Sequence, residues 1–239
     1  MNRHLNTIII AALSLLLIFL IEPRMERGYL HWRVISHTKG MSKSESEWAD
    51  IYYTAQDSEY IPLIKRLTDF YLPLILDDFM VKNPKRAVIV VYPSAAQFRE
   101  AVGQLDALPM GAYYGRVINI ISPSLWMTNA HNAFAKDYFI QYGPLIHEMV
   151  HYAADTPRVG RNTQPWLSEG VALYYEYKYT GVEWRPDLEK KAAEISMSEL
   201  NQNFRQLDNR VAYRKAFDAV RAFVRKYGED RLQRLLAQT

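Results

Sequence analysis

The residues best suited to chemistry lie in the stretch "HEMVH", which runs from His147 to His151. Two histidines four positions apart on a helix lie on the same face, so both imidazoles can reach one metal ion. Glu148 lies about 100° around the helix axis, where its carboxylate can reach a metal-bound water without being a ligand. This spacing predicts metal-assisted hydrolysis, with His147 and His151 as ligands and Glu148 as the general base. A pair of histidines without a metal is the alternative.

Catalytic zinc usually takes three protein ligands and leaves a fourth position for water. The chain contains no cysteine, so the third ligand must be a histidine, an aspartate or a glutamate. Glu169 is the preferred candidate, because it follows His151 by 18 positions and falls on the next expected helix. His131 is the competitor, but it lies in the polar stretch "MTNAHNAF", which has no clear helical position.

Proline and glycine mark the ends of the two helices that must carry these side chains. The first is expected to begin at Pro144, where a missing N–H costs nothing, and to end at residues 155–157. The second has Pro165 in its first turn and Gly181 at its exit. A short loop between them would let the two helices pack side by side.

The rest of the chain shows strand and helix signals first and helix signals last. We expect strands in residues 48–55, 86–93 and 111–123, and helices in residues 60–80, 94–104 and from 186 onward. Pro73 is expected to interrupt the first of these helices, and Ser94 is a suitable N-cap for the second. This order predicts an α+β fold with a small mixed sheet.

The stretch "LIHEMVHYAAD" followed by "PWLSEGVALYYEY" resembles the gluzincin zinc metallopeptidases, specifically the peptidase-MA-like group, whose pattern is HExxH and then a W-L-x-E-G helix. The resemblance implies Zn²⁺ held by His147, His151 and Glu169, with Glu148 as the catalytic base. It also implies a peptide or protein substrate, laid in extended form along an edge strand by the cleft, here near "GAYYGRVINI".

The chain departs from this family's pattern in two ways. Thermolysin-like relatives place the glutamate slightly further from the second histidine than Glu169 lies from His151. Thermolysin-like relatives carry an acid four residues after the glutamate ligand, where this chain has Leu173. Support for the histidines must therefore come from elsewhere, and Asp155 and Glu176 are the candidates. Tyr213 is the first candidate for the hydrogen-bond donor to the transition state, although it also lies on an apolar helical stripe that suits core packing.

The N-terminus contains a nearly unbroken apolar run, Thr7 to Ile21, preceded by Arg3 and His4. As a helix it would reach roughly 22 Å, and no small-x-small cleavage pattern follows it, so we expect a retained anchor over residues 1–24 rather than a cleaved signal peptide. A linker is expected over 25–47 and the metallopeptidase-like domain over 48–239. The domain is expected outside the cytoplasm, membrane-anchored or, alternatively, secreted.

Composition narrows the class of protein. A hydrophobic content of 49% over 239 residues supports one ordered domain, and a net charge of +3 with intermixed signs argues against nucleic acid as a partner. Two functions remain. The first is a membrane-anchored zinc metallopeptidase, and the second is a catalytically silent binding or scaffold protein with the same fold. The presence of Glu148 favours the enzyme.

Overall fold

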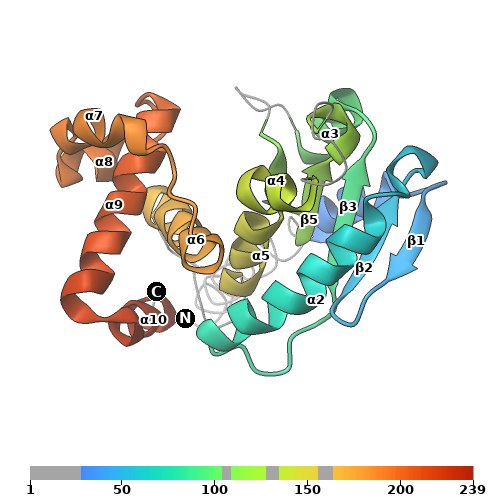
Figure 1. The fold of residues 1–239 in the computed structure, drawn as a ribbon, viewed down its shortest axis with the longest axis horizontal. Helices are drawn as coiled ribbons and strands as arrows, with labels where there is room; N and C mark the ends of the chain where they lie inside the picture. The colour runs from blue at the N-terminus through green and yellow to red at the C-terminus, as the bar shows by residue number, and fades with distance from the viewer. Residues whose placement is uncertain (1–27, 104–108, 128–134, 156–163, 239) are drawn as a thin grey trace, which may run out of the picture.

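A mixed five-stranded β-sheet lies in one half of the molecule in the computed structural model, which describes residues 28–103, 109–127, 135–155 and 164–238 (Figure 1). The strands are β1 (Ser42–Glu45), β2 (Ala49–Tyr53), β3 (Ala87–Tyr92), β4 (Gly111–Tyr114) and β5 (Val117–Ile121). Their order is β1-β2-β3-β5-β4, with β2, β3 and β5 parallel and the two edge strands antiparallel to their neighbours. The expected α+β class with a small mixed sheet is confirmed.

Helices account for most of the remaining described chain. They are α2 (Ile61–Asp78), α3 (Ala95–Val102), α4 (Ala135–Tyr142), α5 (Leu145–Ala154), α6 (Pro165–Thr180), α7 (Glu189–Glu194), α8 (Met197–Asn203), α9 (Asn209–Tyr227) and α10 (Glu229–Gln238), with short 3-10 turns at Ala55–Asp57, Pro123–Leu125 and Pro186–Leu188. Figure 1 shows α6 between α5 and α9, so the C-terminal helices extend the molecule away from the sheet.

Both faces of the sheet are buried, because the central strands are apolar on both sides. Ile89 and Val91 on β3 belong to the main core, which also contains the buried faces of α2 and α5. Val90 and Tyr92 on the same strand belong to a second cluster with α3. The sheet is therefore the middle layer of three, and α5 is fixed against one face of it.

A glycine allows helix α6 to lie close to α9. A Cβ atom at Gly170 would lie 2.5 Å from the Ala216 carbonyl oxygen and 2.9 Å from Val220 Cγ2. Only glycine therefore allows this approach without a shift of one helix. Because Gly170 follows Glu169 directly, the contact also sets the position of the predicted glutamate ligand.

The predicted interruption of a helix at Pro73 is wrong. Helix α2 continues through Pro73 from residue 61 to residue 78. A proline inside a helix removes one hydrogen bond and costs about 3 kcal/mol. Leu72, Ile75 and Leu76 are buried next to it, and their burial holds the helix on the sheet despite that cost.

The predicted linker over 25–47 is wrong for its described part. Residues 28–36 are helical, with Val34 fully buried and His31 Nδ1 2.8 Å from the Gly115 carbonyl oxygen. Strand β1 follows and pairs with β2. Polar and charged side chains are typical of an exposed edge strand, so the composition that indicated a linker is that of a sheet edge. The folded domain therefore begins before residue 48.

The predicted membrane anchor, residues 1–24, lies outside the described residues. Among the helices that the structure describes, none combines the length and the apolar composition needed to cross a bilayer.

Candidate metal centre

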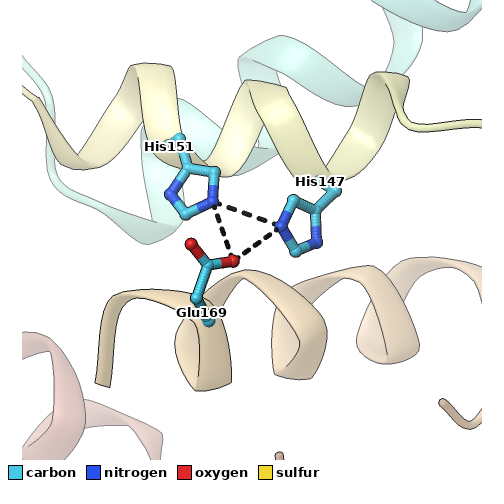
Figure 2. A group of neighbouring side chains, drawn as sticks. All are labelled: His147, His151 and Glu169. Atoms are coloured by element: carbon cyan, nitrogen blue, oxygen red, sulfur yellow. Dashed lines mark hydrogen bonds and ion pairs between the residues drawn. The ribbon is translucent and has the colours of Figure 1, made fainter. Parts of the chain in front are cut away.

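Two adjacent helices place the predicted metal ligands. Helix α5 begins at Leu145, one residue after the predicted start, because Pro144 is its N-cap residue. Helix α6 has Pro165 in its first turn and ends at Gly181, whose φ of 72° is the left-handed conformation that glycine adopts readily. Figure 2 shows both imidazoles of α5 facing a single carboxylate oxygen of α6.

The three side chains present one ligand atom each to a common point. His147 Nε2 lies 3.2 Å from His151 Nε2 and 3.2 Å from Glu169 Oε2, and His151 Nε2 lies 3.5 Å from the same oxygen. Tetrahedral zinc with bonds of about 2.0–2.1 Å would separate its ligand atoms by about 3.3 Å. The triangle therefore has the size that zinc requires. That these residues hold zinc stays a prediction.

Each histidine has a partner on its other ring nitrogen. His147 Nδ1 lies 3.3 Å from Glu176 Oε2, and His151 Nδ1 lies 3.4 Å from Ser168 Oγ. When these Nδ1–H groups donate, both Nε2 lone pairs face the Glu169 carboxylate. Three electron-pair donors at about 3.3 Å repel one another unless a proton or a metal ion lies between them. The arrangement fits a bound cation.

The pKa shifts of His147 and Glu169 also fit a bound cation. Burial alone would lower the pKa of His147, but hydrogen bonds with Glu169 and Glu176 raise it well above its usual value. Burial alone would raise the pKa of Glu169, but hydrogen bonds with His147 and His151 hold it far below its usual range. The carboxylates therefore attract positive charge to the Nε2 positions, and either a proton or a bound cation would supply that charge.

Glu148 lies between α5 and the edge strand β4, where it is only 5% exposed. Burial raises the pKa of its carboxyl, and a hydrogen bond from the Tyr113 backbone opposes part of that rise. A carboxyl with a raised pKa is suited to accept a proton and then release it. A Cβ atom at Gly111 would lie 3.0 Å from Glu148 Oε1 and 2.5 Å from Pro144 Cβ, so glycine is required for this approach. Sequence reasoning did not identify that role.

Of the two predicted supporting acids, the structure brings only one to the histidines. Glu176 reaches His147, and because it follows Glu169 by seven positions, or about two helical turns, the two lie on the same face of α6. Asp155 instead accepts a hydrogen bond of 2.9 Å from the Tyr113 hydroxyl and lies 3.6 Å from Arg116. The prediction that Asp155 supports the histidines is therefore wrong; it fastens the β4–β5 hairpin to the end of α5.

Of three further residues, Tyr213 and His131 were predicted from the sequence and Ser168 was not. Tyr213 on α9 interacts with Glu169, and burial together with this negative charge raises the pKa of its hydroxyl, so the group stays protonated and able to donate. Its ring also stacks on Phe204 at 5.5 Å, so it contributes to packing as well. Ser168 was not identified from the sequence, yet it is the partner of His151. His131 lies outside the described residues.

The three converging side chains line a cleft of about 1160 Å³. One part of its wall is the edge strand β4 with Met110 before it, and another part is the start of α9. The cleft is large enough for a peptide segment, since binding sites for small ligands span about 300–1,000 Å³.

Comparisons with known proteins find one distant relative. The chain is 22% identical over 217 residues to "Uncharacterized protein YhcO" of Bacillus subtilis (strain 168). The match covers 84% of this chain and 64% of the relative, so the chain spans less than two thirds of that protein's length. No protein-family model matches, and no solved structure matches.

Replacing Glu176 is expected to weaken zinc binding. In Glu176→Ala the Nδ1–H of His147 loses its acceptor, and loss of such a partner typically costs 10–100-fold in metal affinity. Glu176→Gln keeps an acceptor oxygen and should lose less. Competition with a chromophoric chelator measures both affinities, with Glu100→Gln on the exposed side of α3 as the control. Wild-type affinity in Glu176→Ala would contradict the assignment.

Proposed function

We propose that this protein is a zinc-dependent metallopeptidase that hydrolyses peptide bonds with a metal-activated water molecule. The proposal rests on one observation, the convergence of two Nε2 atoms and one carboxylate oxygen within 3.2–3.5 Å. The resemblance of the HExxH and W-L-x-E-G helices to peptidase-MA-like gluzincins supports the same reading.

Zinc held by His147, His151 and Glu169 would lower the pKa of a water molecule and polarise the substrate carbonyl. Glu148 would take the proton from that water and pass it to the leaving amine, and the raised pKa of its buried carboxyl supports this role. Tyr213 is placed beside Glu169 with a protonated hydroxyl, which suits a donor to the developing oxyanion.

The edge strand supports an extended peptide as the substrate. The Ile121 N–H donates to the Met110 carbonyl, so the alternation of an antiparallel ladder directs the backbone groups of Gly111 and Tyr113 away from β5. The Tyr113 backbone holds Glu148, and the Gly111 N–H and C=O face the side of β4 that pairs with no other described strand. A peptide that pairs with this edge would pass directly beside the general base.

The apolar run from Thr7 to Ile21 supports a membrane anchor with the catalytic domain outside the cytoplasm. A secreted form would follow if that run were removed as a signal peptide. A catalytically silent binding protein remains the alternative function, and the placement of a buried Glu148 next to the ligand triangle favours the enzyme.

Removal of the metal tests the proposal. The purified protein is expected to bind zinc stoichiometrically and to cleave casein or members of an unbiased peptide library. A chelator should abolish cleavage, and added zinc should restore it, because the water is activated only by the metal. Zinc content is measured by elemental analysis and cleavage by mass spectrometry. Tight zinc binding without cleavage of any peptide would favour the silent binding protein.

A further inference from the structure

Two arginines line the cleft on the wall that leads into α9. They are Arg205, just after α8, and Arg210, in the first turn of α9. They are the only lysine or arginine side chains on the cleft lining within the described residues. The acidic residues of that lining lie instead on α5 and α6, at Glu148, Glu169 and Glu176, and at Asp155 just after α5. The cleft therefore has positive charge near α9 and negative charge near the candidate metal ligands.

Neither guanidinium has a close hydrogen bond or ion pair with another described residue. Arg205 makes no hydrogen bond or ion pair with any other described residue. The nearest carboxylate to Arg210 is that of Asp208 at 3.9 Å, and both of those side chains are more than half exposed. An exposed ion pair at this distance contributes little to stability. The charge of Arg210 therefore remains available to a ligand.

Both arginines are exposed, and they share the lining of the cleft with apolar side chains. Trp184, Phe204 and Leu207 belong to this lining, and the rings of Trp184 and Phe204 lie against Tyr213 on α9. Apolar walls beside a guanidinium lower the local dielectric and strengthen its attraction for an anion. Because a guanidinium donates two parallel hydrogen bonds, a carboxylate is a matching ligand.

Helix α9 sets the distance between Arg210 and the candidate metal centre. Arg210 precedes Tyr213 by three positions, so it lies on a neighbouring turn of the same helix face. The Tyr213 hydroxyl interacts with Glu169, which fixes that turn at the metal centre. One turn is about 5.4 Å, and an extended peptide advances about 3.3 Å per residue. A group bound by Arg210 therefore lies within about two residues of the bond at the metal.

We propose that the cleft selects peptides carrying a carboxylate within about two residues of the scissile bond, and that Arg205 and Arg210 bind this carboxylate. The inference deepens the proposed peptidase function and rests on it. The carboxylate is either an Asp or Glu side chain or the C-terminus of the peptide, since both present the same group to a guanidinium.

Four fluorogenic peptides separate the two sources of the carboxylate. They share one sequence and carry either Glu or Gln near the scissile bond, each with a free or an amidated C-terminus. The full chain is compared with the double variant Arg205→Gln/Arg210→Gln and with Arg225→Gln, an exposed arginine at the far end of α9. We expect the double variant to raise KM about tenfold for the preferred carboxylate peptide and to leave the neutral peptide nearly unchanged.

Binding to the Glu148→Gln protein provides a readout without turnover. Fluorescence anisotropy of a labelled carboxylate peptide should show an affinity that falls with salt and with the double arginine variant, but not with Arg225→Gln. Arginine-dependent binding without cleavage in the wild type would support the subsite and sink the peptidase proposal. Cleavage with equal preference for Glu, Gln, free and amidated peptides would support the peptidase and overturn the carboxylate subsite.

Discussion

Glu148→Gln is expected to lower kcat for peptide cleavage by about 10²–10⁴-fold while leaving zinc binding intact. The amide has nearly the same shape as the carboxyl, so it fits between α5 and Gly111, but it cannot accept the proton of the attacking water. Because Glu148 is not among the three converging ligands, the metal should remain bound.

The measurement pairs steady-state cleavage of a peptide library hit with the zinc content of the same sample. Glu100→Gln, an exposed glutamate on α3, is the matched control and should behave as the wild type. Full activity in Glu148→Gln would show that another group moves the proton. Loss of zinc from that variant would show instead that Glu148 is a ligand.

Glu169→Ala is expected to lower zinc affinity by more than about 100-fold, which is the upper range for loss of an outer partner of a ligand. The substitution removes the one carboxylate that both Nε2 atoms face, and two imidazoles alone leave the ion short of its usual three protein ligands. Cleavage should be lost with the metal.

Thermal unfolding with and without zinc gives a second readout for Glu169→Ala. At free zinc about 1,000 times its dissociation constant, binding stabilises the wild type by about 4 kcal/mol. The variant should show little of this stabilisation at the same zinc concentration. An equal zinc-dependent rise in Tm for both proteins would remove Glu169 from the ligand set.

Local signals in the sequence were sufficient for the two central helices. Pro144, Pro165 and Gly181 mark their ends in the sequence and in the structure, because proline and glycine act on the backbone without help from distant residues. The four-residue spacing of His147 and His151 likewise places both rings on one face of any α-helix.

Sequence reasoning failed where a local pattern has two physical outcomes. The polar stretch that contains β1 has the composition of a linker and equally that of a charged edge strand, and only pairing with β2 decides between them. Pro73 breaks an isolated helix, yet the burial of neighbouring side chains in the core keeps α2 intact.

By itself the sequence determined the class of fold, the two helices and the candidate residues His147, His151, Glu148 and Glu169, since each depends on short-range spacing. Tertiary structure alone decided that Glu176 rather than Asp155 reaches His147, and that Gly111 lets β4 approach Glu148. It also placed Arg205 and Arg210 on the cleft. These contacts depend on how far apart packed elements lie, and that distance is set by residues remote in the chain, such as Gly170 against Ala216.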